Sequence, residues 1–183
     1  MQPATEMALT DRAEGAGQEL PDFAEIVRQT QGMVFSMAYH FLHDRPLAEE
    51  LAQEVFLQLH RHMSEFQSMA HLTFWLRRVT SNRCIDCARR RKLRPQVGLD
   101  SVPEPAAIPP AGDPMLSGKL TRLVASLPEK ARMVMILRYQ EDLDPDDIAQ
   151  ALKMPVRTVK SHLQRSLALL RAKLVRSVGK ENL

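Results

Sequence analysis

The stretch "DPDDIAQALKMPVRTVKSHLQRS" (144–166) predicts two consecutive helices joined by a tight turn. Asp144 suits the N-cap of the first helix and Pro145 its first position, with acidic residues in the turn that follows. Two residues remain for the connection before Pro155, which starts the second helix. We therefore expect a short helix, a tight turn and a longer second helix.

The second helix separates an apolar face from a basic, polar face. Its apolar stripe consists of Val156, Val159, Leu163, Leu167, Leu170 and Leu174. Side chains that can donate hydrogen bonds to DNA lie outside this stripe: Arg157, Thr158, Lys160, Ser161, Gln164 and Arg165. Arginine and glutamine can read base edges, whereas lysine and serine suit phosphates. The pattern is typical of a helix-turn-helix that enters the major groove, and the alternative is an ordinary helical hairpin with a solvated basic face.

Charge is distributed unevenly along the 183-residue chain. Residues 1–66 contain 11 acidic and 4 basic residues, whereas residues 67–183 contain 11 acidic and 21 basic residues. From Lys153 to Lys180 there are eight Lys or Arg and no Asp or Glu. This asymmetry indicates a polyanionic partner for the basic part and a different kind of partner for the acidic part.

The composition, 44% hydrophobic and 26% charged, is typical of a soluble globular protein. No apolar run approaches the ~18–20 residues that span a bilayer, and the N-terminus does not follow the secretory pattern. The two cysteines, Cys84 and Cys87, cannot form a disulfide framework. We therefore expect a cytoplasmic protein.

Helical periodicity predicts an all-α fold with two small domains. The expected helices cover 21–42, 45–63, 71–92, 115–127, 129–140, 145–152 and 155–177. Six of the twelve prolines fall between Pro95 and Pro114, which indicates a semi-rigid linker. We therefore divide the chain into a flexible tail (1–20), an N-terminal domain (21–92), a Pro-rich linker (93–114), a C-terminal helix-turn-helix domain (115–177) and a second tail (178–183).

The ordered combination of "SLPEKAR", "LRYQEDL", "DDIAQAL" and "PVRTVKSHLQRS" within 123–174 resembles the promoter-reading domain of the extracytoplasmic-function (ECF) sigma factors of bacterial RNA polymerase. The segments "ELAQEVFLQLHRHMSEF" (50–66) and "FWLRRVTSNRCIDCARRRK" (74–92) resemble the other conserved sigma domain. Response-regulator output domains carry similar recognition helices, but the N-terminal half shows no alternating strands and helices. Arg157 stands where the family usually has glycine, and Pro145 where an aromatic residue is common, so the preferred bases can differ.

The helix expected over 45–63 has a second, acidic side. Ala48, Leu51, Ala52, Val55 and Leu59 share its core-facing side, and Glu50, Gln53, Glu54 and Leu57 lie opposite. A single exposed leucine is common, but a leucine within an acidic rim indicates an anchor for a protein partner. The resemblance implies that this partner is the pair of clamp helices of core RNA polymerase.

The helix expected over 71–92 is strongly basic. Trp75, Arg78, Asn82, Ile85 and Arg89 recur along one stripe, and Arg90 follows. An aromatic ring among cations suits unstacked bases, although Trp75 can equally belong to the core. The resemblance implies that the preceding loop "FQSMAHL" (66–72), with Phe66 and Gln67, helps to capture a base flipped out of the −10 element. Gln67 and Ser68 replace the family's usual Arg-Gly pair, so the resemblance gives no base preference.

We expect no cofactor, no metal and no catalytic residue. Cys84 and Cys87 form a CxxC, but structural zinc needs four ligands and usually a second pair. No Gly-rich phosphate loop or nucleophile–base set is visible. Opening DNA costs a few kcal/mol per flipped base, which binding energy can supply without catalysis.

The sequence thus predicts an ECF-type sigma factor rather than an enzyme. The resemblance implies that it binds core RNA polymerase through the clamp helices and the flap, recognises and melts the −10 element, and reads the −35 element in the major groove. It also implies an anti-sigma factor, which could hold the chain at the membrane. The alternatives are a stand-alone helix-turn-helix regulator and a zinc- or redox-sensing adaptor that uses Cys84 and Cys87.

Overall fold

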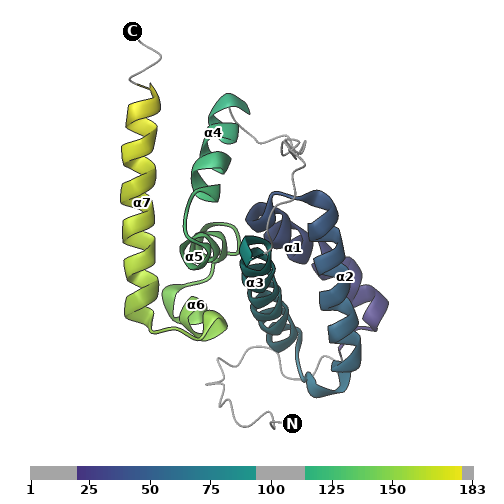
Figure 1. Cartoon of the computed structure of the whole chain (residues 1–183). Coiled ribbons are helices and arrows are strands. Elements are labelled where there is room, and N and C mark those ends of the chain that lie inside the picture. The colour runs from purple at the N-terminus through teal and green to yellow at the C-terminus, as the bar shows by residue number, and fades with distance from the viewer. Residues whose placement is uncertain (1–19, 94–113, 179–183) are drawn as a thin grey trace.

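The computed structural model describes residues 20–93 and 114–178, which form seven α-helices and one short 3-10 helix (Figure 1). The N-terminal helices are α1 (Phe23–Leu42), α2 (Arg45–Arg61) and α3 (Met69–Leu93), with the 3-10 helix Met63–Glu65 between α2 and α3. The C-terminal helices are α4 (Pro114–Ala125), α5 (Glu129–Tyr139), α6 (Pro145–Leu152) and α7 (Val156–Val178). The described residues contain no strand, and the all-α prediction is confirmed. The expected linker and tails fall almost entirely outside the described residues.

Local sequence signals set several helix ends. The Asp144 carboxylate accepts hydrogen bonds from the backbone N–H groups of Asp146 and Asp147, at 2.9 and 3.0 Å. Asp22 caps α1 in the same way, and Asp44 caps α2. The left-handed backbone of Lys153 (φ 49°) ends α6 and turns the chain into α7. The capped start and tight turn predicted from the sequence are therefore confirmed.

The N-terminal helices form a three-helix bundle in which α1 packs against both α2 and α3. The side of α2 that carries Ala48, Leu51, Val55 and Leu59 is buried, as its periodicity predicts. Their partners include Phe41 from α1 and Leu76 from α3, both fully buried. None of the helices within the described ranges combines the length and the apolar character needed to cross a bilayer.

The C-terminal helices pack around α5, most of whose residues from Ala131 to Leu137 are buried. Both α6 and α7 contact α5, and α6 also contacts α7. The helix α4 packs on α7 around a small second cluster of Leu127, Ala131, Met135 and Leu170. This arrangement leaves the outer side of the first turns of α7 exposed.

The two groups of helices also pack against each other, with α3 lying between the rest of the N-terminal bundle and α5 and α6 (Figure 1). One continuous cluster of buried side chains includes Phe41 and Ile85 from the N-terminal helices and Leu137 and Ile148 from the C-terminal helices. The sequence pattern predicted two domains on a tether but gave no sign of this contact, because the residues that make it lie far apart along the chain, as do Arg132 and Phe41 at 91 positions.

Candidate functional site

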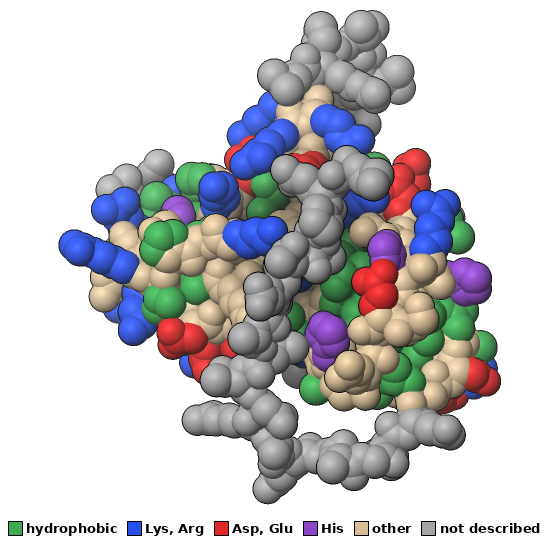
Figure 2. Space-filling model, turned by 90° about the horizontal axis from the view of Figure 1, so that it is seen from below, with side chains coloured by type: hydrophobic (Ala, Val, Ile, Leu, Met, Phe, Trp, Pro, Cys, Tyr) green, Lys and Arg blue, Asp and Glu red, His purple; other side chains and the backbone are tan. Residues whose placement is uncertain are grey.

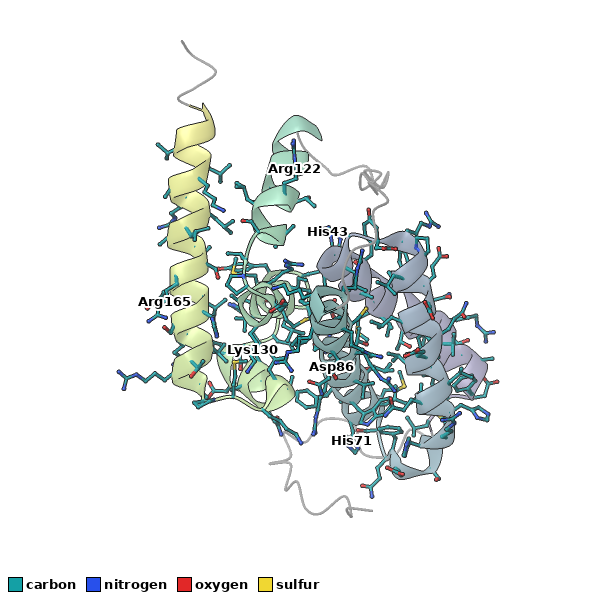
Figure 3. All side chains as sticks on the ribbon, viewed as in Figure 1. His43, His71, Asp86, Arg122, Lys130 and Arg165 are labelled. Carbon is teal, nitrogen blue, oxygen red and sulfur yellow. The ribbon has the colours of Figure 1, made fainter. Side chains whose placement is uncertain are left out.

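The first half of α7 presents a basic surface to solvent. Val159 is fully buried and anchors the helix, whereas five of the six predicted DNA-binding residues are exposed and Ser161 is half-buried. The exposed five are Arg157, Thr158, Lys160, Gln164 and Arg165. The structure therefore brings all six together on a helix that starts directly after a tight turn. Figure 3 shows Arg165 on the side of α7 that faces away from α5 and α6.

Nothing neutralises this surface within the described part of the chain, where no carboxylate pairs with Arg157, Lys160 or Arg165. Burial lowers the pKa of His162, and the nearby charges of Arg165 and Lys130 lower it further. Lys130, which comes from α5, was missed by the sequence prediction because it lies outside the recognition helix. Lys130 is exposed and lies near the start of α7, so its charge adds to the positive surface there.

The predicted −10 residues lie at the outer edge of α3 and the turn before it. Asn82, Arg89 and Arg90 are exposed, as is Gln67 in the turn, whereas Arg78 is half-buried. Arg78, Asn82 and Arg89 recur along one stripe of α3, while Gln67 lies before the start of the helix and Arg90 near its end. Arg78 has no carboxylate partner among the described residues, and Arg89 has only a long contact to Asp86, at 3.7 Å.

Trp75 and Phe66 form a small aromatic cluster at the start of α3. Their ring centroids lie 5.3 Å apart in an edge-on arrangement, and His71 lies 5.3 Å from Phe66. Trp75 remains half-buried, but Phe66 is only 7% exposed, so its ring is not free to contact DNA in this conformation. Phe66 instead supports Trp75, which keeps part of its ring at the surface.

An apolar groove of about 760 Å³ lies between α1 and α2. Leu57, 61% exposed, and Gln53 line it, while Glu50 and Glu54 are exposed nearby on α2, opposite the buried side of that helix. The other side of the groove comes from α1 and was not predicted; the full lining is Phe23, Val27, Gln31, Gly32, Phe35, Glu49, Ala52, Gln53, Phe56 and Leu57. The four-residue spacing of Phe23, Val27, Gln31 and Phe35 could have indicated it.

Seen from below in Figure 2, Lys and Arg side chains gather at the outer edge of the half formed by the C-terminal helices, while hydrophobic and His side chains are more prominent on the N-terminal half. The basic surface of α7 belongs to the first of these halves, and the apolar groove between α1 and α2 belongs to the second. The two surfaces therefore differ in the chemistry of the partner they suit.

The CxxC of α3 does not form a metal cluster within the described residues, where no three potential ligands gather. Cys84 is fully buried, and this burial raises the pKa of its thiol far above the ordinary value. Burial also raises the pKa of Cys87, against the opposing effect of Arg90 and Arg91. A buried, protonated thiol is an inert packing group rather than a reactive one.

Both halves of the chain match known protein families. The Sigma-70 region 2 family matches residues 26–94, which include α3 and all of the groove lining except Phe23. The Sigma-70 region 4 family matches residues 117–170, which include the basic surface of α7. The RNA polymerase sigma-E factor of Streptomyces coelicolor is 30% identical over 157 residues, covering 86% of this chain and 88% of the relative. The chain belongs to the ECF sigma factors of bacterial RNA polymerase.

Other relatives agree with this assignment. The ECF RNA polymerase sigma factor SigW of Bacillus subtilis is 28% identical over 169 residues, covering 83% of this chain and 88% of that protein. The fold of this sigma factor is similar to that of RpoE in its co-crystal structure with the anti-sigma factor NepR from Bartonella quintana. The TM-score is 0.69 at 19% identity, with 83% of this chain and 96% of that chain covered. Family and fold therefore favour a transcription initiation factor over a stand-alone regulator or a zinc adaptor.

Proposed function

We propose that this sigma factor uses three separate surfaces to direct promoter-specific initiation. The groove between α1 and α2 binds core RNA polymerase, the outer edge of α3 binds the −10 element, and the start of α7 reads the −35 element. Residues 21–92 form the unit for the first two tasks, residues 115–177 the unit for the third, and residues 93–114 connect them. The observation that carries the proposal is the presence of an apolar groove and two exposed cationic surfaces in the two sigma regions.

At the −35 element, α7 enters the major groove with its first turns. Arg157, Gln164 and Arg165 have the donors to read base edges, and Lys160 and Ser161 suit phosphates. The tight turn at Lys153 sets the angle between α6 and α7, so that α6 lies across the backbone as in other helix-turn-helix proteins. Lys130 of α5 adds a phosphate contact beside α7.

At the −10 element, the free energy of binding an extruded base offsets the cost of opening the duplex. Trp75 offers a partly exposed ring on which an extruded base can stack, and Arg78, Arg89 and Arg90 hold the phosphates around it. Stacking contributes about 1–3 kcal/mol per base, which is comparable to the cost of taking a base out of the duplex. The factor therefore needs no catalytic side chain, and we propose that it is not an enzyme.

The polymerase partner of the α1–α2 groove is the clamp helix pair. Leu57 and the aromatic lining bury apolar side chains of a helix, and Glu49, Glu50 and Glu54 complement basic residues beside them. The flap is the second polymerase contact, made by the C-terminal domain. We expect a cytoplasmic protein whose activity an anti-sigma factor limits, since the similar structure of RpoE is a complex with the anti-sigma factor NepR.

The decisive experiment adds this chain to core polymerase that lacks any sigma factor and sequences the transcripts from a random promoter library. Enriched −10 and −35 sequences support the proposal, and transcription that stays independent of promoter sequence contradicts it. Leu57→Asp should weaken binding to core polymerase by about 30-fold, because anchors of this kind contribute about 2 kcal/mol or more. Ser64→Asp, which adds the same charge at an exposed position outside the groove, is the control.

A further inference from the structure

Some basic residues of α3 form ion pairs with carboxylates of the N-terminal helices, and others form ion pairs with carboxylates of the C-terminal helices. Arg83 pairs with Glu54 of α2 at 3.4 Å, and Arg91 with Asp44, the cap of α2, at 3.3 Å. The partners of two others come from the C-terminal domain instead. This division separates the ion pairs that hold the N-terminal bundle together from those that reach across to the other domain.

The two cross-domain pairs lie far apart on α3. Arg77 Nε is 3.0 Å from Glu141 Oε2, and Lys92 Nζ is 2.5 Å from Glu129 Oε1. Glu141 is only 7% exposed in the turn after α5, and Glu129 stands at the first position of α5. Fifteen residues of helix separate Arg77 from Lys92, which corresponds to about 22 Å. The C-terminal domain thus places two carboxylates along the length of a basic helix.

The side of α3 that carries Arg77 and Lys92 adjoins the stripe that carries Arg78 and Arg89. The Arg77 side chain is largely buried, at 24% exposed, whereas the Lys92 side chain is 71% exposed and is neutralised by its ion pair rather than by burial. At 100° per residue, Lys92 lies about 60° from Arg89 around the helix axis, and Arg77 directly precedes Arg78. Ser81 lies between Arg77 and Lys92 on the same side, is fully buried, and its hydroxyl has no hydrogen-bond partner in the described part of the structure. An orphaned buried hydroxyl is rare, and here it indicates a polar face that is covered without being satisfied.

We propose that Arg77 and Lys92 contact DNA phosphates in the open factor, and that Glu141 and Glu129 mask them while the C-terminal domain is docked. This inference rests on the proposed use of α3 for promoter DNA. A carboxylate and a phosphate oxygen bind guanidinium and ammonium groups through the same charge-assisted hydrogen bonds. The docked domain therefore competes with DNA for this side of α3, and opening adds two phosphate contacts to the exposed stripe.

Substituting the two carboxylates, Glu129 and Glu141, should break the ion pairs while leaving Arg77 and Lys92 intact. We would measure binding of the full-length chain, without polymerase, to a fluorescein-labelled 20-nucleotide single strand of mixed sequence, over a series of salt concentrations. Glu129→Gln/Glu141→Gln should bind at least 3- to 10-fold more tightly than the parent. The slope of log K against log salt should steepen by about 1.4, at ~0.7 for each phosphate contact.

The control for net charge is Asp142→Asn/Asp146→Asn. It removes two carboxylates from the same domain, but Asp142 pairs only with Arg138 of its own domain, and Asp146 is exposed with no cross-domain ion pair among the described residues. A second variant, Arg77→Gln/Lys92→Gln, breaks the same two ion pairs from the DNA-binding side. Dyes on the exposed residues Ser64 and Ala172 should report domain separation in both pair-breaking variants, but only the carboxylate variant should gain DNA affinity.

The proposal is overturned if Glu129→Gln/Glu141→Gln binds no more tightly than the charge control, if it leaves the dye separation unchanged, or if Arg77→Gln/Lys92→Gln gains affinity equally. Arg78→Gln/Arg89→Gln separates this failure from failure of the proposed function. If that variant still weakens DNA binding, α3 binds DNA and only the masking is wrong. If it leaves binding unchanged, the assignment of α3 to DNA fails and the masking fails with it.

Discussion

The two basic helices, α3 and α7, use their charges differently. α3 has more arginines, but four of its basic residues pair with carboxylates from other parts of the chain: Arg77, Arg83, Arg91 and Lys92. α7 has fewer basic residues, and those of its first turns have no carboxylate partner in the described ranges. The number of positive residues in a helix therefore does not measure the charge that it offers to DNA.

The contact that makes this difference centres on Arg132 of α5. Its guanidinium donates to the carbonyl oxygen of Phe41 at 2.8 Å, stands over the Phe41 ring, and donates to the carbonyl oxygens of Ala125 and Leu127. Arg132→Met removes these donors, so we expect the free energy of unfolding to fall by about 3 kcal/mol. A urea titration would measure the loss. Arg77 and Lys92 of α3 should then be free to contact DNA, whereas Arg83 and Arg91 stay paired within the N-terminal bundle.

Lys130→Met, two positions away on the exposed side of α5, is the control for that experiment. A surface substitution of this kind changes stability by no more than about 0.5 kcal/mol. Equal urea midpoints for the two variants would show that Arg132 does not hold the domains together, and the difference between α3 and α7 would need another cause.

Acid should weaken the same contact. His43, at the end of α1 on the side of the C-terminal helices (Figure 3), has its pKa lowered to about 4, first by burial and then by Arg132 and His40. Because the unfolded or undocked chain binds this proton near pH 6.5 and the native chain only near pH 4, stability is complete above about pH 6.5 and falls as the pH drops towards 4. We expect a loss of roughly 2 kcal/mol, since the partly exposed ring does not feel the full shift.

Thermal unfolding between pH 7 and 4.5 would measure this dependence. The hydrogen bond to Lys92 lowers the pKa of Glu129, so the stability that this carboxylate contributes begins to fall only at the acid end of the window. His43→Asn suits the left-handed backbone at this position (φ 52°) and removes the titrating ring. An equally steep loss in His43→Asn would assign the pH dependence to other groups.

The local features of this fold could be predicted from sequence, and the contacts between domains could not. The cap at Asp144 and the exposure of Leu57 follow from neighbouring residues and helical periodicity. In contrast, the sequence around Arg132 predicts only an ordinary surface arginine, because the Phe41 carbonyl to which it donates is 91 positions away. Phe66 was placed on the DNA surface by the family resemblance of its loop, and its burial depends on packing against His71 and Trp75, which no periodic pattern records.

On α7, a single arginine should affect both affinity and specificity. Arg165 is exposed on the outer side of the recognition helix, and Arg165→Ala should weaken binding of the holoenzyme to its −35 sequence by about 1–2 kcal/mol and relax the preference at one base pair. Promoter-library transcription would detect the relaxed position. Loss of affinity with unchanged base preference would make Arg165 a phosphate contact instead.

The smallest effect that we expect is the difference in DNA binding between substitution of an unpaired arginine and substitution of a paired arginine on α3. Arg78 has no carboxylate partner among the described residues, whereas Arg83 pairs with Glu54 and donates to Gln58. Arg78→Gln should lower single-strand affinity only a few-fold and reduce the salt slope by about 0.7, because one phosphate contact is lost. Arg83→Gln removes the same charge from the same helix but should leave the slope unchanged, since its guanidinium is already bound within the bundle. If both variants reduced the slope equally, pairing would not decide which charges of α3 reach DNA.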